Sequence, residues 1–288
     1  MAITGPWVGS SAKAETGQAW MTEAAKVVRL HAAPFWMSEL IGGTKEVYIT
    51  LNWNDHNYNP DDLINRINQV TGGNYANAAI VINVSGQYVA PNTWTPCFRF
   101  PAAMASVAYI RINNSGYIFG RGGNGRGYKD YGTNGSSGKG QGDTDIAGGN
   151  GGPAIQNDIG GKLQIYNTGV ISGGGAGGAG VWQESSYTSG GADNGMVRYA
   201  DYLMWGAGGA PFGDHGAEGP EVIGRHPLRQ PMRDSYVAAN LTQPGHYRNN
   251  MGLGGQLGQG VGGASAGYAI SNQSPNWINR GDVRGPSM

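Results

Sequence analysis

The chain has 288 residues with 19 basic and 19 acidic side chains, so its formal net charge is zero. This balance lacks the basic excess of nucleic-acid-binding domains and predicts no nucleic-acid partner. A single cysteine, Cys97, excludes an intrachain disulfide and a cysteine zinc cluster. The first residues have no secretory signal pattern, and no apolar run approaches the roughly 18 residues of a membrane span. The sequence therefore predicts a soluble protein made in a cytoplasm.

Glycine is distributed unevenly along the chain. Of its 53 glycines, only eight lie in residues 1–115. Such a change of composition is typical of a domain boundary. We therefore expect an α+β domain over residues 1–115 and a glycine-rich domain over residues 116–288.

Three helices are expected in the N-terminal region. Apolar side chains at helical spacing predict the first over residues 12–31, with Ser11 as its N-cap. A short second helix is expected over residues 35–41, where two glycines end it. The third has the clearest signals, because Asn59 can cap it, Pro60 opens its first turn and an apolar face follows.

Strands are expected where β-branched and aromatic residues are dense. These segments are residues 46–51, 79–84 and 106–112. Together with the helices they predict a mixed domain.

Large apolar side chains are concentrated in the first forty residues. They are Trp7, Trp20, Met21, Trp36 and Met37. One interpretation is a small hydrophobic core. The other is an interface, because tryptophan and methionine are enriched at the centres of contacts. A small domain has little room to bury so many large side chains, so the two interpretations can hold together.

A pattern with a period of two recurs along the chain. It reads apolar-x-Asn-x-Gly-x-apolar-x-Gly at residues 112–120, 165–173 and 277–285, with a weaker copy at 82–88. The period predicts strands, and the central asparagine and glycine predict a tight turn or a left-handed residue. Each copy is therefore expected to form a strand, a bend and a strand. Uneven spacing between copies argues against a regular solenoid and favours struts in one β-layer.

Six glycine runs fill much of the second domain, at residues 120–125, 148–152, 173–180, 190–195, 206–213 and 252–263. Flexible linkers are one interpretation, since glycine-rich chains are usually flexible. The other is a stack of polyglycine II helices, each rising ~3.1 Å per residue, that bond to one another through their backbones. Aromatic residues between the runs favour the ordered stack.

The segments between the runs combine aromatic residues with serine, asparagine and glycine, a composition typical of binding loops. The candidate binding aromatics are Tyr128, Tyr131, Trp182, Tyr187, Tyr199, Tyr202, Tyr236 and Tyr247. Three arginines, Arg225, Arg229 and Arg233, add a basic patch suited to acidic loops or phosphate groups. Solvated loops with incidental aromatics are the alternative.

Motifs for cofactors and metals are incomplete. Residues 120–125 fit a dinucleotide fingerprint, but no helix-forming sequence follows them. Asp143 and Asp145 lack the rest of a calcium loop, and the histidines show no metal-ligand spacing. We expect no cofactor and no metal. A carboxylate pair for glycoside hydrolysis stays open, although acidic residues are sparse.

Several segments together carry a family resemblance. They are residues 5–11, 15–18, 20–21, 36–38, 55–57, 120–125, 155–161 and 210–213. With these segments the chain resembles the distal long-tail-fibre adhesins, the receptor-recognition tip proteins, of T-even-type bacteriophages. It departs from them over residues 214–251, which are long and poor in glycine.

The resemblance implies a non-catalytic protein of the virion, at the distal tip of the long tail fibre. As a monomer it would cap a trimeric shaft protein, with Trp7, Trp20, Met21, Trp36 and Met37 as the attachment residues. Stacked polyglycine II helices would carry variable loops that bind an outer-membrane protein of porin type, or lipopolysaccharide, and determine host range. A tail-fibre assembly factor and a capsular depolymerase are the alternatives.

Overall fold

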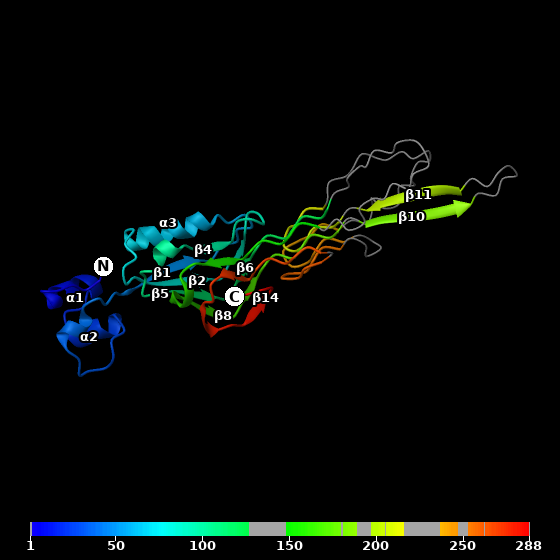
Figure 1. Ribbon diagram of the computed structural model, residues 1–288. Coiled ribbons are helices and arrows are strands. Elements are labelled where there is room, and N and C mark those ends of the chain that lie inside the picture. The colour runs from blue at the N-terminus through cyan, green and yellow to red at the C-terminus, as the bar shows by residue number, and fades with distance from the viewer. Residues whose placement is uncertain are drawn as a thin grey trace.

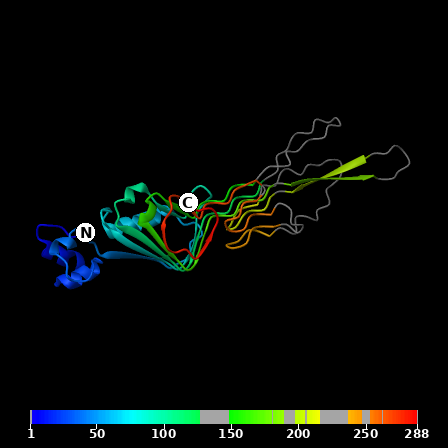
Figure 2. The ribbon, with the colours of Figure 1, turned by 60° about the horizontal axis from the view of Figure 1, so that its bottom comes forward.

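The computed structural model describes residues 2–126, 148–179, 181–188, 197–204, 206–215, 237–246, 253–261 and 263–287. The molecule is elongated and has three successive parts (Figure 1). A small helical unit lies at the N-terminal end, and a body of parallel sheets follows it. Glycine runs then lead away from the body to a two-stranded sheet at the opposite end (Figure 2).

The N-terminal helical unit, residues 2–43, contains three short helices: α1 (Val8–Thr16), α2 (Met21–Val27) and the 3-10 helix η1 (Met37–Leu40). The single helix expected over residues 12–31 is therefore wrong. Gly17 adopts a left-handed φ of 75° and ends α1, with its N–H bonded to the Lys13 carbonyl. The second expected helix is confined to one 3-10 turn.

Small side chains form the core of this helical unit. The buried residues are Ile3, Val8, Ala12, Ala24, Ala25 and Leu40. None of the helices in the described ranges is long and apolar enough to cross a bilayer. The helices are short and their core is small, so packing between them, rather than helix propensity, must hold the unit together.

Helix α3 (Pro60–Thr71) confirms the third expected helix. The Asn59 side chain accepts a hydrogen bond from the Asp61 N–H at 3.1 Å, as an N-cap should. Leu63 and Ile67 are fully buried against the body. The sequence signals at the start of this helix are local, and the structure uses them as expected.

The body consists of three parallel sheets. The first has the order β1 (Glu46–Leu51), β2 (Ala79–Val84), β5 (Tyr109–Asn114), β8 (Leu163–Asn167) and β13 (Asn276–Asn279). The second has the order β14 (Asp282–Arg284), β9 (Val170–Ser172), β6 (Tyr117–Phe119) and β3 (Gln87–Val89). The third has the order β12 (Ile270–Asn272), β7 (Ile155–Asn157) and β4 (Phe98–Phe100). Two further 3-10 turns are η2 (Ala102–Met104) and η3 (Gly160–Lys162).

The sequence repeat forms the strand, bend and strand that its pattern predicts. The two strands of each copy lie in different sheets, however, so the single β-layer is wrong. Successive copies stack in parallel as turns of one coil. The copies are unevenly spaced because long segments leave the coil and return between strands. Uneven spacing of the copies therefore does not exclude a solenoid-like arrangement.

Bends of neighbouring copies are held together by asparagine and glycine. Buried Asn114 donates to the Asn167 Oδ1 at 2.8 Å, and Asn167 donates in turn to the Arg280 carbonyl at 2.9 Å. A Cβ on Gly116 would lie 2.2 Å from the Gly86 carbonyl oxygen. Glycine is required there because neighbouring backbones approach closely, rather than because the residue is left-handed.

The hydrophobic core runs through the whole coil, from Ile49 on β1 to Ile270 on β12. The first sheet continues across residue 115, since β5 pairs with β8 over five registered positions. The change in glycine content at residue 115 thus falls inside one core. What changes there is the length of the excursions between strands.

The described glycine runs are cross-linked through their backbones. Within residues 174–178, successive N–H groups bond to different neighbouring runs, and the neighbours of Gly174 and Gly175 recur three residues later. The bonds to two of these neighbours are Gly174 to Gly152 at 2.9 Å, Gly177 to Gly149 at 2.8 Å, Gly175 to Ala210 at 2.6 Å and Gly178 to Ala207 at 2.7 Å. These bonds rule out a flexible linker for the described runs.

The two-stranded sheet pairs β10 (Val181–Thr188) with β11 (Val197–Met204) in antiparallel register. It lies at the far end of the glycine runs from the helical unit (Figure 1). This places it at the opposite pole of the molecule.

Candidate binding surfaces

Three tryptophans of the helical unit are exposed to solvent. Trp7, Trp20 and Trp36 are 79%, 77% and 78% exposed. Each occupies the N-cap position of one short helix. Side chains favoured at this position accept backbone hydrogen bonds, and an indole has no acceptor atom. The rings therefore do not serve the helix ends, and they present apolar surface outward.

The core interpretation of the N-terminal residues is wrong for the three tryptophans. Of the two methionines, Met37 is also 46% exposed, whereas Met21 packs against the buried residues of the unit. A local signal could have revealed this arrangement. Residues 20–23 read Trp-Met-Thr-Glu and residues 36–39 read Trp-Met-Ser-Glu, so one motif opens two helices. Clusters of exposed apolar side chains commonly mark interaction sites.

Glu39 holds the backbone at Trp36. Its carboxylate accepts the Trp36 N–H at 2.9 Å and lies 2.7 Å from the His31 Nε2. The hydrogen bond to the Ala32 carbonyl and the bond to Glu39 raise the pKa of His31 above 6.5. The hydrogen bonds from Trp36 and His31 lower the pKa of Glu39 below 4.5. The pair is therefore charged over a range of mildly acidic pH.

We expect this pair to support the helical unit most strongly between about pH 4.5 and 6.5. Since the folded pKa of His31 is raised, its contribution is complete below 6.5 and is lost as the pH rises through the raised value. Since the folded pKa of Glu39 is lowered, its contribution is complete above 4.5 and is lost as the pH falls through the lowered value. An NMR titration of the His31 ring measures the first change directly.

In a Glu39→Gln variant the His31 pKa should fall part of the way toward 6.5, because the bond to Ala32 remains. Glu23→Gln is the matched control, since Glu23 pairs with Lys26 in the same unit. An unchanged His31 titration in Glu39→Gln would contradict the pairing.

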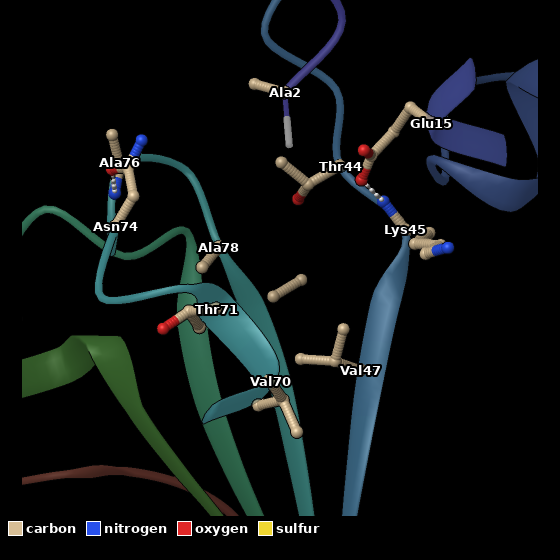
Figure 3. Close-up of a pocket in the computed structure, with 11 residues that line it drawn as sticks. Ala2, Glu15, Thr44, Lys45, Val47, Val70, Thr71, Asn74, Ala76 and Ala78 are labelled. Atoms are coloured by element: carbon tan, nitrogen blue, oxygen red, sulfur yellow. Dashed lines mark hydrogen bonds between the residues drawn. The ribbon is translucent and has the colours of Figure 1, made fainter. Parts of the chain in front are cut away.

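Residues 42–45 join the helical unit to the body. The Lys45 N–H donates to the Glu15 Oε1 at 3.1 Å, and the Thr44 hydroxyl donates to the Asn77 carbonyl at 2.6 Å. Glu15, Thr44 and Val47 are among the residues that line a small pocket at this junction (Figure 3). Its volume is about 60 Å³. This volume holds a few water molecules and no organic ligand, so the junction is a joint and not a ligand site.

A second set of contacts braces the same joint. The Glu46 carboxylate accepts hydrogen bonds from the Tyr48 and Tyr109 hydroxyls, and Arg29 lies 3.9 Å from it. The Arg29 guanidinium also stacks 5.2 Å from the centre of the Tyr109 ring. Partial burial raises the pKa of Glu46, but the tyrosine hydrogen bonds and Arg29 outweigh it and lower the pKa overall. The segment that follows α2 is thereby tied to β1.

At the other end of the body, Arg121 links three segments. It donates to the His56 carbonyl at 3.1 Å and to the Asn57 Oδ1 at 3.2 Å. Its guanidinium also lies 5.5 Å from the Phe212 ring, which packs 4.9 Å from the His56 ring. Burial lowers the pKa of Arg121. Sequence reasoning missed this cluster, because its members are far apart along the chain.

Four of the expected receptor-binding aromatics lie on the distal two-stranded sheet. Trp182 and Tyr187 belong to β10, and Tyr199 and Tyr202 belong to β11. The structure thus brings these four residues together. The others lie outside the described residues: Tyr128, Tyr131, Arg225, Arg229, Arg233, Tyr236 and Tyr247.

Clusters of metal-binding side chains are missing from the described ranges. No group of three or more histidine, cysteine, aspartate or glutamate side chains there could hold a metal ion. Cys97 is buried in the core, and burial raises its thiol pKa, so it is not a nucleophile. The described surface instead exposes aromatic side chains, such as the three tryptophans of the helical unit.

Residues 46–288 match the family model for the phage tail fibre adhesin Gp38, and residues 1–41 match the model for its N-terminal domain. The chain belongs to the Gp38 family of phage tail fibre adhesins. It is 34% identical over 289 residues to the receptor-recognizing protein gp38 of Salmonella phage S16, with 99% of both chains covered. It also matches a chain of the crystal structure of the gp37–gp38 adhesin tip complex of the bacteriophage S16 long tail fibre. That match has a TM-score of 0.66 and 31% identity, and covers 100% of both chains.

The expected resemblance to phage tail-fibre adhesins is confirmed, and such an adhesin is a component of the virion. The observed mixture of helices and parallel sheets agrees with the matched structure. The two family models meet between residues 41 and 46, where the structure has its joint. Family membership does not favour an assembly factor or a depolymerase.

Proposed function

We propose that this adhesin caps the distal tip of the long tail fibre, with its helical unit on the shaft protein and its opposite pole toward the host cell. It acts as a monomer on a trimeric shaft, after synthesis in the host cytoplasm, and does no catalysis. The observation that carries the proposal is the exposure of Trp7, Trp20 and Trp36 at one pole. The S16 relative, crystallised together with gp37, supports a fibre protein as the partner.

Apolar burial is sufficient to drive such an attachment. A tryptophan buries 150 to 250 Å² in a contact, which is worth roughly 4 to 6 kcal/mol of transfer free energy per ring. Three rings exceed the cost of association if the partner offers matching pockets. Met21 and Met37 adjoin the rings and would pack against the same partner.

Receptor binding is assigned to the opposite pole. The aromatic residues of β10 and β11, with the aromatic and arginine residues outside the described ranges, would contact an outer-membrane protein of porin type or lipopolysaccharide. The S16 relative is named a receptor-recognizing protein, which supports this role. Differences in these segments between phages would then determine host range.

The glycine runs are proposed to be stacked polyglycine II helices that hold the distal pole. Two observations support this arrangement. Hydrogen bonds from residues 174–178 return to the run 148–152 and to the run 206–213 after three residues, which is the period of that helix. A Cβ on Gly174 would lie 1.9 Å from the Arg121 carbonyl oxygen, so the adjacent run leaves no space for a side chain at this position.

Adsorption competition tests the proposed function. Purified adhesin is expected to block phage attachment to the host and to lose this effect on one strain that lacks its receptor. Failure of the folded protein to block attachment to any permissive strain would reject the receptor role. Absence of reducing-sugar release from host polysaccharide is the accompanying expectation for a protein without catalysis.

A further inference from the structure

The first turn of the coil has a short loop where later turns have long excursions. Strands β3, β6 and β9 are neighbours in one parallel sheet and end at the same level of the body. After β6 and β9 the chain enters glycine runs, but after β3 it enters a loop over residues 90–97. We call this loop the Trp94 turn. A Cβ on Gly152 would lie 2.8 Å from the Thr93 Cα, so the turn packs at the base of the glycine runs.

Hydrogen bonds of the local backbone hold Trp94 in a solvent-exposed position. Its ring is 90% exposed, and in the part of the chain that the structure describes no side chain covers it. The Asn92 Oδ1 accepts the Trp94 N–H at 2.9 Å and the Thr95 N–H at 2.8 Å. Buried Ala90 and Cys97 anchor the two ends of the turn. A rigid, exposed tryptophan is suited to binding, because little conformational entropy is lost when it makes a contact.

The turn itself is polar and uncharged. Residues 90–97 include no acidic or basic side chain, and the polar residues nearest Trp94 in the sequence are Asn92, Thr93 and Thr95. Indole combines an apolar face with a single N–H donor. A neutral hexose has the complementary chemistry, with an apolar face of C–H groups and a rim of hydroxyls. A strongly charged ligand would find no partner in this turn.

The distance of the Trp94 turn from the membrane distinguishes a saccharide ligand from the receptor protein. The glycine run 173–179 spans about 22 Å at the rise of a polyglycine II helix. Strand β10, with eight residues, adds about 27 Å. Both views place the glycine runs and then the distal sheet in succession beyond the body (Figures 1 and 2). If the distal pole touches the receptor, the turn stands roughly 50 Å further from the membrane. Surface polysaccharide reaches that height, and a protein embedded in the membrane does not.

We propose that the Trp94 turn binds neutral hexose units of the polysaccharide on the host surface, as a second contact behind the receptor-binding pole. This inference rests on the proposed orientation of the adhesin. A weak contact of this kind gains strength when several fibres bind one cell. It would hold the phage near the surface while the distal pole searches for its receptor.

Binding of purified adhesin to immobilised lipopolysaccharide tests the proposal. The probes are smooth lipopolysaccharide from the host, with its long polysaccharide, and a truncated form without it. Wild type is expected to bind the smooth form, and Trp94→Ala to bind it about tenfold more weakly. Trp94→Phe should keep most of the affinity. Tyr166→Ala, which removes an exposed ring on β8, should bind like wild type.

Three results would overturn the proposal. They are absence of wild-type binding to smooth lipopolysaccharide, equal binding by Trp94→Ala, and an equal loss by Trp94→Ala on the truncated form or on purified receptor protein. Failure of the proposed function is seen separately. On host cells without surface polysaccharide, wild type and Trp94→Ala should block adsorption equally. If neither blocks it on any strain, the receptor role fails, while the lipopolysaccharide measurement still decides whether the turn binds sugar.

Discussion

Replacing Trp7, Trp20 and Trp36 together by alanine is expected to abolish binding of the adhesin to the fibre shaft without unfolding it. Each ring is more than three-quarters exposed, so its removal leaves no cavity in the core of the helical unit. Each single substitution should weaken shaft binding at least about 30-fold, since buried tryptophans at interface centres typically contribute 2 kcal/mol or more.

The measurement is co-purification of the variants with the shaft protein, together with mass spectrometry of assembled virions. Trp94→Ala is the matched control, because Trp94 is also highly exposed but lies on the body. It should bind the shaft like wild type, and the melting temperatures of all variants should agree. A triple variant that co-purifies normally would show that attachment uses another surface.

Replacing Gly174 by alanine is expected to destabilise the adhesin by at least about 3 kcal/mol, the upper range for overpacking a dense interior. The new methyl carbon would lie 1.9 Å from the Arg121 carbonyl oxygen and 2.4 Å from its carbon. Backbone atoms cannot move aside as the end of a flexible side chain can. Displacing the Arg121 carbonyl would also break the hydrogen bond that it accepts from the Gly152 N–H.

Denaturant unfolding followed by circular dichroism measures this effect. Gly161→Ala is the matched control, since no atom lies within 4 Å of its Cβ position, and its stability should change by less than about 0.5 kcal/mol. Ala176→Gly provides a second comparison, because it removes a buried methyl from the same run and should cost about 1 kcal/mol. If Gly174→Ala were as stable as Gly161→Ala, the runs could not pack as the structure has them.

Residues close to the ends of an element predicted those helices and strands whose ends depend on nearby sequence. Helix α3 begins at the expected cap, and β1 and β2 have the expected bounds. The single helix expected over residues 12–31 is wrong because Gly17, whose left-handed conformation ends α1, interrupts that segment. Apolar spacing alone does not show such an interruption.

The sequence by itself determined the family and the strand–bend–strand repeat. It also distinguished the tryptophan-rich N-terminal segment from the aromatic segments between the glycine runs. Only the tertiary structure decided which sheet each strand joins, which aromatics stay in water and how Arg121 meets Phe212. Strand periodicity specifies a conformation but not a partner, and the exposure of Trp7 or Trp94 depends on neighbours distant in the chain. The glycine runs show the limit most clearly. Their contacts are backbone hydrogen bonds between residues without side chains, so no residue pattern in the sequence records which run lies beside which.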